Sequence, residues 1–257
     1  MGFKNTILHF GFAFLVSACG MHNGAPPLSG GDGIVNGKSL PPRNPVAKSV
    51  VALVSDRSEG QALCTGTILD EQNILTAAHC VDRNSEHIYI VFRNRLTKAM
   101  KDDVRSADDF LQLPEWKKSK GESGDIAVIH FTGGLPEGYQ AVQLADSSVQ
   151  LQVGEEVVMA GYGVSHPEKD AGSGALRETK TTITGSMNRN QIATDGRLSS
   201  VCFGDSGGPA FVHDGAQWIQ WGVAHAVSNR DCDETSLHTS IVPYQRWIRS
   251  AMKILSK

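Results

Sequence analysis

One eight-residue stretch constrains this chain more than any other: residues 202–209 read Cys-Phe-Gly-Asp-Ser-Gly-Gly-Pro. Its glycines, Gly204, Gly207 and Gly208, can adopt positive φ and let another backbone approach closely. The N–H groups of such a run can point at an oxygen that becomes negative during a reaction. A glycine-rich turn with an incidental serine is the alternative interpretation. The stretch therefore predicts a Ser206 hydroxyl held inside an oxyanion-binding loop.

Two further stretches supply what a serine nucleophile lacks. A serine hydroxyl reacts slowly at neutral pH unless a base lies beside it and a third group orients that base. His79, within Thr-Ala-Ala-His-Cys at 76–80, offers the base. Asp125 precedes the apolar run 126–131, where its carboxylate can be buried against an imidazole. The competing carboxylates lack such a following strand; they are Asp102, Asp108 and Asp109.

In the order His79, Asp125, Ser206, these stretches resemble the chymotrypsin-like serine peptidase family. Further matches to the family are Ile-Val-Asn-Gly at 34–37, Gly-Tyr-Gly at 161–163 and a closing helix over 243–255. The resemblance extends from Ile34 to the C-terminus. It implies an all-β fold of two six-stranded antiparallel β-barrels and a C-terminal helix. The implied divisions are barrel one at about 34–135, barrel two at about 136–242 and the helix at about 243–255.

Short apolar runs bounded by Gly, Asp and Asn are typical of strands and fit this architecture. They cover 49–54, 64–69, 73–76, 87–92, 126–131, 142–144, 156–162, 179–184, 191–194, 209–212, 218–227 and 237–242. The charged segment 93–109 predicts a surface loop with an edge strand. Trp247, Ile248, Met252 and Leu255 recur at helical spacing, so we expect the last helix to pack on the second barrel.

The resemblance implies acyl transfer to Ser206. His79 would accept the serine proton and later protonate the leaving amine, while Asp125 fixes the imidazole tautomer. The backbone N–H groups of Gly204 and Ser206 would hold the oxyanion. The substrates would be proteins or peptides, with no cofactor and no metal. A catalytically silent relative that serves as a binding or adhesion module is the alternative function.

Asp205 has a separate role in the family. It pairs with the new α-amine that cleavage creates, here that of Ile34, and a lone buried partner would be costly. Cleavage before Ile34 would therefore activate a zymogen. Capping of a turn is the alternative role of Asp205.

Substrate preference follows from the residues aligned with the family's pocket. Ser200 takes the floor position, where trypsin-like members carry an acid that binds Lys or Arg. Val227 and Ser236 stand where wide-pocket members carry glycine, which predicts an elastase-like preference for small uncharged residues; an aromatic preference is the alternative. His225 replaces a serine that contacts the triad carboxylate, so we expect His225 near Asp125.

Four of the five cysteines lie within the peptidase segment. Four cysteines allow three pairings. The resemblance selects Cys64 with Cys80 and Cys202 with Cys232. The sequence contains no Cys-x-x-Cys pair, and its histidines show no ligand spacing. It therefore gives no indication of a metal site.

The remaining cysteine, Cys19, follows an apolar run that begins after Lys4 and is too short to span a bilayer. Residues 15–19, Leu-Val-Ser-Ala-Cys, end this run and resemble the cleavage site of a bacterial lipoprotein signal. The resemblance implies a signal peptide over 1–18, a lipid on Cys19 and a tether over 19–33. A plain secretory signal cut near Ala18 is the alternative. We expect a lipid-anchored precursor in the cell envelope, released or secreted after activation.

The formal net charge of -3 gives no indication of nucleic-acid binding. No long apolar run follows the N-terminal segment, so the sequence predicts membrane attachment only through Cys19. We expect a monomer.

Overall fold

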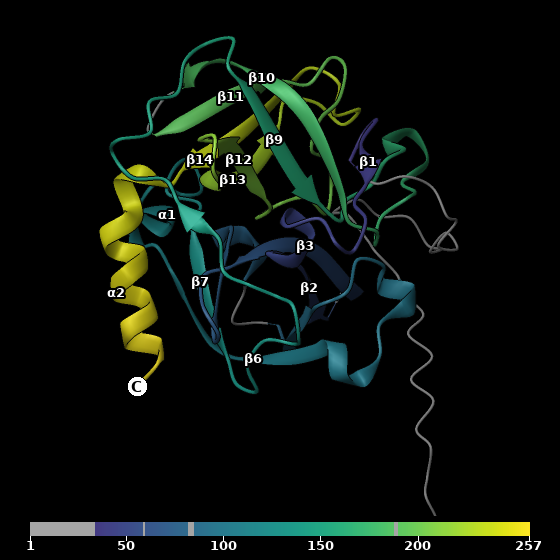
Figure 1. Cartoon of the computed structure of the whole chain (residues 1–257), viewed down its shortest axis with the longest axis vertical. Helices are drawn as coiled ribbons and strands as arrows, with labels where there is room; N and C mark the ends of the chain where they lie inside the picture. The colour runs from purple at the N-terminus through teal and green to yellow at the C-terminus, as the bar shows by residue number, and fades with distance from the viewer. Residues whose placement is uncertain (1–33, 59, 82–84, 188–189) are drawn as a thin grey trace, which may run out of the picture.

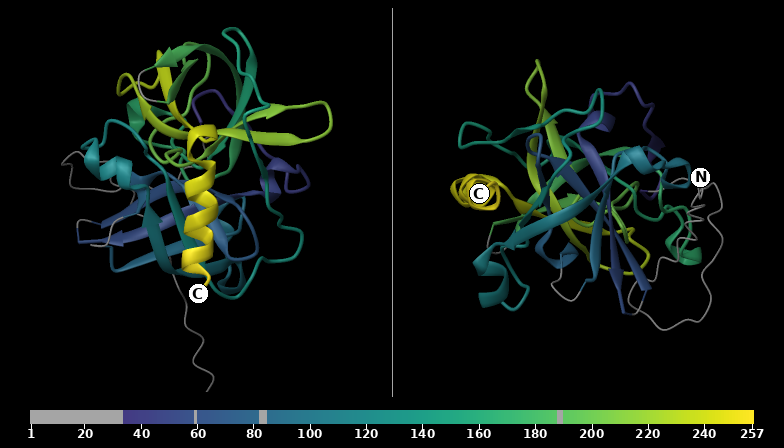
Figure 2. Two further views of the ribbon diagram at one scale, coloured as in Figure 1. Left: turned by 90° about the vertical axis from the view of Figure 1, so that its left-hand side faces the viewer. Right: turned by 90° about the horizontal axis from the view of Figure 1, so that it is seen from below.

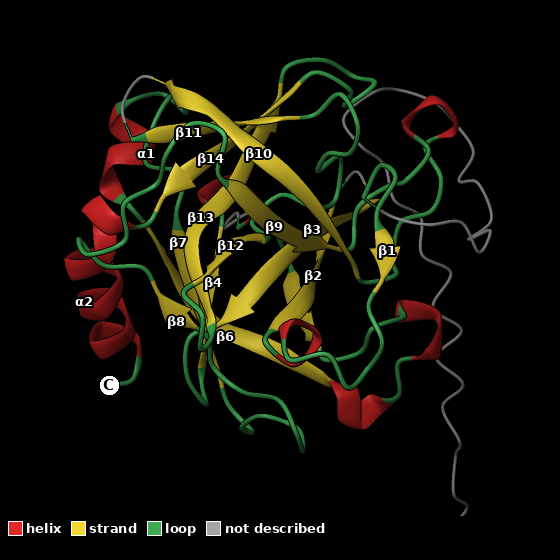
Figure 3. Cartoon of the chain, turned by 45° about the horizontal axis from the view of Figure 1, so that its top comes forward, coloured by secondary structure: helices red, strands yellow, loops and turns green. Residues whose placement is uncertain are grey.

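The structure is a computed structural model that describes residues 34–58, 60–81, 85–187 and 190–257. These residues form two β-barrels, the first in blue and teal and the second in green to yellow in Figure 1. The helices lie at the periphery of the strands (Figure 3). The predicted signal peptide, Cys19 and tether fall outside the described residues.

The first barrel closes in the order β2-β3-β4-β7-β6-β5. Its strands are β2 (Val50–Arg57), β3 (Gly60–Ile68), β4 (Asn73–Thr76), β5 (His87–Val91), β6 (Val104–Gln112) and β7 (Ala127–Phe131). The predicted edge strand within 93–109 is wrong, because β6 pairs with both β5 and β7 and so closes the barrel. Phe110 is the one buried residue of β6, which explains why this strand lacks an apolar sequence signal.

The second barrel contains β9 (Glu156–Gly161), β10 (Arg177–Met187), β11 (Gln191–Asp195), β12 (Pro209–His213), β13 (Trp218–Val227) and β14 (Thr235–Ser240). The sheet runs β10-β11-β14-β13-β12-β9, and pairing of β9 with β10 closes the six-stranded ring. Two short strands extend it: β1 (Lys38–Ser39) pairs with β10, and β8 (Gln143–Leu144) pairs with β13. The predicted fold is confirmed in both barrels.

Two α-helices and six short 3-10 turns complete the described chain. They are α1 (Pro114–Lys118), α2 (Gln245–Leu255), and the turns η1 (Val46–Lys48), η2 (Ala78–Cys80), η3 (Leu96–Lys98), η4 (Lys101–Asp103), η5 (Pro167–Lys169) and η6 (Val242–Tyr244). No helix in the described ranges combines the length and apolar character that a membrane span requires.

Helix α2 corrects one expectation, because it packs on the first barrel and not on the second. Ile248 and Ala251 are buried in a core shared with the first-barrel residues Phe110 and Val128. The turn η6 follows β14 and directs the chain back across the junction, where the Tyr244 hydroxyl donates to Glu115 Oε1 at 2.8 Å. Figure 2 shows the helix running from the second barrel down the side of the first. The helical spacing identified the apolar face correctly, but it carries no information about which barrel covers that face.

The two barrels meet at Thr65, a fully buried residue of β3. Its hydroxyl donates to the carbonyl of Gly204 at 2.9 Å and accepts from the N–H of Tyr162 at 3.1 Å. Its own N–H donates to the carbonyl of Ser206 at 2.8 Å. A strand of the first barrel thus fixes the serine loop of the second, and the candidate site lies at this junction.

Candidate active site

His79 lies on the turn η2, directly after β4. Two constraints hold this turn. The predicted disulfide joins Cys64 to Cys80, with 6.1 Å between the Cα atoms. The side-chain amide of Gln112 donates to the carbonyls of Ala78 and Val81, at 2.9 and 2.8 Å. The imidazole therefore projects from a backbone segment that is anchored on both sides.

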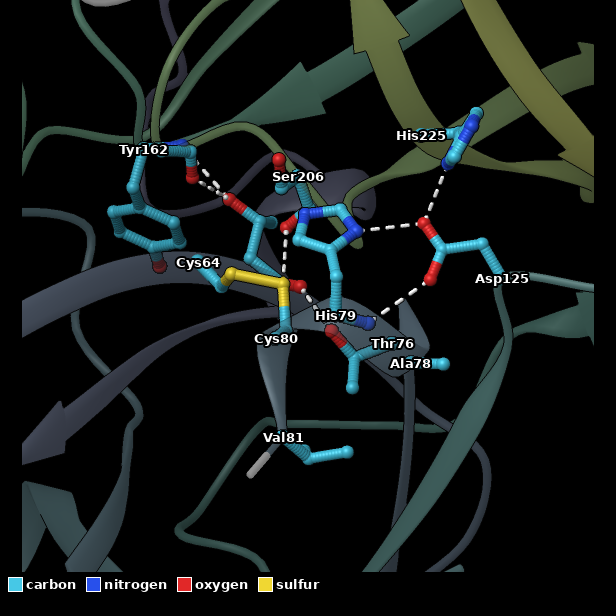
Figure 4. The surroundings of a disulfide bond; sticks show 12 residues. Cys64, Thr76, Ala78, His79, Cys80, Val81, Asp125, Tyr162, Ser206 and His225 are labelled. Atoms are coloured by element: carbon cyan, nitrogen blue, oxygen red, sulfur yellow. Dashed lines mark hydrogen bonds and ion pairs between the residues drawn. A yellow bond between two sulfur atoms is a disulfide. The ribbon is translucent and has the colours of Figure 1, made fainter. Parts of the chain in front are cut away.

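Asp125 is fully buried beside His79. Its Oδ1 accepts the backbone N–H of His79 at 2.9 Å, and its Oδ2 lies 2.6 Å from His79 Nδ1. His225 Nδ1 contacts the same Oδ2, also at 2.6 Å, which is the contact expected from the sequence. Figure 4 shows the two imidazoles on the carboxylate and Ser206 on the far side of the His79 ring.

Electrostatics keep this carboxylate ionised. Burial alone would raise the pKa of Asp125, because a charged group is poorly solvated in the protein interior. The hydrogen bonds from His225 and His79 outweigh that effect and hold the pKa well below its usual range. Asp125 is thus a permanent hydrogen-bond acceptor that keeps the His79 proton on Nδ1, so that Nε2 carries the free lone pair.

The loop around Ser206 has the backbone that its glycines predict. Gly204 and Gly207 adopt φ of 97° and 81°, and a Cβ on Gly207 would lie 2.0 Å from Thr76 Oγ1. The carbonyl of Ala224 on β13 accepts the Gly207 N–H at 2.8 Å. Within the described residues, the N–H groups of Gly204 and Ser206 donate to no protein acceptor. This loop therefore leaves two amides available to a ligand.

A cavity of about 330 Å³ opens beside Ser206. Its lining combines both imidazoles with mainly apolar side chains: His79, Val201, Cys202, Phe203, Ser206, Ala224, His225, Ala226 and Val227. No side chain in this lining carries a carboxylate. The cavity can therefore receive an uncharged side chain next to the serine hydroxyl.

Two of the four predicted pocket residues line this cavity and two do not. Val227 and His225 form part of its wall. Ser200 is fully buried and donates to the carbonyl of Val201, whereas Ser236 is fully buried opposite Val227 in the β13–β14 pair. Both serines thus lie behind the lining rather than on it. The second predicted disulfide, Cys202–Cys232, borders the same wall, with 5.6 Å between its Cα atoms.

Asp205 points away from the cavity into the protein. Its Oδ1 accepts the N–H of Gly163 at 2.7 Å and its Oδ2 accepts the N–H of Cys202 at 2.8 Å. Burial raises the pKa of this carboxyl to about 7, although the two N–H groups and the Arg177 charge act against the rise. The Ile34 side chain is fully buried, and Val35 pairs with Ser200 through backbone hydrogen bonds.

Sequence reasoning missed three residues that shape the site: Thr65, Gln112 and Trp116. The Trp116 ring lies 6.2 Å from the His79 ring and 6.0 Å from the His225 ring, between centroids. It belongs to α1, a helix of five residues with no strand-like or motif-like signal. Each of the three acts through a contact distant in sequence, which no local pattern reveals.

Comparison with known proteins agrees with this geometry. The family model described as Trypsin matches residues 34–248. The chain belongs to the trypsin family. Among its relatives are snake venom serine protease 3 of Protobothrops jerdonii and human granzyme M, each 25% identical to it. The venom alignment covers 73% of this chain and 77% of the relative, and the granzyme alignment covers 77% and 82%.

Trypsin-family membership identifies this chain as a serine endopeptidase acting on proteins or peptides. Mouse transmembrane protease serine 11G is also similar, at 24% identity over 76% of this chain and 51% of that protein. The matched region begins at Ile34 and contains every residue of the site described above.

Proposed function

We propose that this trypsin-family enzyme cleaves peptide bonds through an acyl-enzyme on Ser206, with His79 as the general base and Asp125 as its orienting group. The observation that carries the proposal is the 2.6 Å contact between His79 Nδ1 and the buried Asp125 carboxylate, in a cavity that His79 shares with Ser206. These are the three groups that a serine nucleophile needs, which supports the proposal. The catalytically silent alternative is not favoured, since none of the three is replaced.

The reaction follows from these positions. Ser206 Oγ attacks the peptide carbonyl carbon and its proton passes to His79 Nε2. The N–H groups of Gly204 and Ser206 stabilise the resulting oxyanion, and Asp125 stabilises the imidazolium. The C–N bond then breaks as His79 protonates the leaving amine. Water hydrolyses the ester by the same proton route, which regenerates the Ser206 hydroxyl.

We further propose that the enzyme prefers substrates with a small uncharged residue before the cut bond. The mainly apolar wall of the cavity supports it, and Val227 narrows the cavity where a glycine would widen it. The absence of a lining carboxylate argues against Lys and Arg. An aromatic preference is the alternative. A peptide-library profile tests the preference: cleavage after Ala, Val, Ser or Thr supports it, and a profile dominated by Phe and Tyr refutes it.

We also propose activation by cleavage before Ile34. The high pKa of Asp205 supports this step, because a buried carboxyl that is costly to ionise would be stabilised by the new α-amine. Gly33 before the bond is a small residue, so the enzyme's own pocket would accept it. A disulfide between the removed segment and the enzyme would require a cysteine upstream of Ile34, and the proposed lipid occupies Cys19.

Export and lipid attachment complete the proposal, and cleavage before Ile34 would release the enzyme from the membrane. Cell fractionation tests this: Ser206→Ala should accumulate as a membrane-bound precursor, while the wild type yields a soluble form beginning at Ile34. Wild-type activity that stays wholly with the membrane would rule out release. Equal processing of the Ser206→Ala protein would rule out self-activation.

Kinetics test the catalytic assignment itself. Ser206→Ala and His79→Ala should each lower kcat on a peptide substrate by at least about 10³-fold, since such residues act as a unit. Val153→Ala, at an exposed position outside the site, is the control and should retain wild-type kcat. Activity retained by Ser206→Ala would refute the assignment.

A further inference from the structure

Asp125 Oδ2 is shared by two imidazole nitrogens. Nδ1 of His79 and Nδ1 of His225 each lie 2.6 Å from it. All three groups present a ligand atom within 4.8 Å of the others. The side chains of His79 and His225 are 33% and 13% exposed, so this cluster is reachable from solvent although the carboxylate is buried.

We propose that His79, Asp125 and His225 form an inhibitory binding site for one Zn²⁺ ion, which switches the peptidase off. This inference rests on the proposed role of His79 as the base. Two imidazoles and one carboxylate form a donor set that Zn²⁺ prefers, with a fourth position left for water. Ca²⁺ and Mg²⁺ prefer oxygen ligands and are poor matches for this set.

The charge of the site favours a cation. Asp125 places a buried carboxylate directly between the two imidazoles of this cluster. Trp116 lies beside both rings and provides an apolar wall. A dication bound here would lie next to the Asp125 carboxylate. The dielectric constant of this buried environment is low, which strengthens the attraction between the two charges.

Small movements suffice to admit the ion. Ligand atoms around a tetrahedral zinc lie about 3.3 Å apart, given bond lengths near 2.0–2.1 Å. The two 2.6 Å contacts would therefore lengthen by less than about 1 Å. The His79 side chain is the most exposed of the three, so its ring can shift toward the ion while its backbone turn stays anchored.

The position of the imidazole proton explains the inhibition. Neutral His79 carries one proton, which Asp125 holds on Nδ1. Zinc on Nδ1 requires that lone pair, so the proton moves to Nε2, the nitrogen on the Ser206 side (Figure 4). Nε2 can then no longer accept the serine proton. Because the ion lies behind the imidazole, it would lower kcat while leaving KM nearly unchanged.

A second cluster near His79 does not offer a site. Cys64 and Cys80 lie within ligand distance of His79, but their sulfur atoms are bonded to each other. A disulfide has no thiolate to bind zinc. The cluster around Asp125 is therefore the better zinc site of the two.

Calorimetric titration of the full-length Ser206→Ala chain with Zn²⁺ tests binding without any need for activity. We expect one ion per chain, and at least about 100-fold weaker binding when His225→Ser is added, since a direct ligand is lost. His87→Ser is the matched control, because His87 is exposed at the start of β5 and does not line the cavity that His79 and His225 share, and it should leave the affinity unchanged. Equal zinc affinity with and without His225, or loss of binding in the His87→Ser control, would overturn the site.

Activity assays then test the switch. Zinc-buffered wild-type enzyme should lose kcat with little change in KM, and EDTA should restore it. Inhibition of His225→Ser is measured as a fraction of that variant's own metal-free rate and should need far more zinc. Binding without inhibition would refute the switch. Peptidase activity in Ser206→Ala would instead refute the catalytic assignment. The calorimetric measurement of zinc binding would still be valid, because it does not depend on activity.

Discussion

The N–H of Gly163 donates to Asp205 Oδ1 over 2.7 Å, which ties the segment after β9 to the residue beside Ser206. The two residues are in such close contact that a Cβ on Gly163 would lie 2.5 Å from Asp205 Oδ2. The orientation of the serine loop thus depends on a glycine more than forty residues away in sequence.

Gly163→Ala should displace Asp205 and with it the amides of the oxyanion loop. We expect a loss of about 1–3 kcal/mol in the free energy of unfolding, and a lower kcat through the displaced amides. Chemical denaturation and steady-state kinetics measure the two effects. Gly185→Ala is the control, since no atom lies within 4 Å of a Cβ there. Equal behaviour of the two variants would show that the contact is unimportant.

Asp205 should make the uncut chain less stable as pH rises. Its pKa is about 7 in the folded chain, against 3.8 as the ordinary value. Between about pH 4 and 7 the unfolded chain releases this proton and the folded chain retains it, so folding is favoured at the acidic end. The effect is at most about 1.4 kcal/mol per pH unit.

Unfolding of Ser206→Ala, which prevents self-cleavage, and of Ser206→Ala/Asp205→Asn over this pH range isolates the Asp205 contribution. Both Asp205 oxygens accept backbone N–H groups, so the NH₂ group of Asn would face one of these donors and lower stability at every pH. The readout is therefore the difference between the two proteins in how the free energy of unfolding changes with pH. Parallel pH profiles would show that Asp205 ionises freely in the folded chain.

The pattern of these contacts explains what the sequence predicted and what it did not. Most strands carry their own local signal in the sequence, whereas the two barrels and the approach of His79 to Asp125 are implied by the resemblance of the motifs to a known family. Strand β6 was predicted only as an edge, since its side chains are mostly polar and the barrel closes through its backbone. The packing of α2 and the contact of Trp116 depend on which segments meet in space.

The disulfide Cys64–Cys80 should contribute to both stability and activity. It closes a sequence separation of 16 residues, for which chain entropy predicts about 3 kcal/mol. Replacing both cysteines by Ala should lower the free energy of unfolding by about that amount, and should lower kcat because the His79 turn loses an anchor. The Cys202–Cys232 double replacement is the comparison, since that bond leaves the His79 turn untouched. Unchanged kcat in the first variant would show that Gln112 alone fixes the turn.

Val227→Gly should widen the cavity and shift the residue preference toward larger side chains. Removing the isopropyl group opens space on the cavity wall. Discrimination by such a hydrophobic wall amounts to about 10–200-fold. We therefore expect the ratio of kcat/KM for Phe over Ala before the cut bond to rise by at least about tenfold, measured with matched peptide substrates. An unchanged ratio would mean that Val227 does not limit the pocket.

The central claim is that Ser206 is the nucleophile, activated by His79. A fluorophosphonate probe tests it most directly, because it reacts covalently with an activated serine, and peptide mapping by mass spectrometry locates the adduct. We expect one adduct on Ser206 in the wild type, none in Ser206→Ala and strongly slowed labelling in His79→Ala. Labelling at another residue, or equal labelling of the wild type and Ser206→Ala, would contradict it.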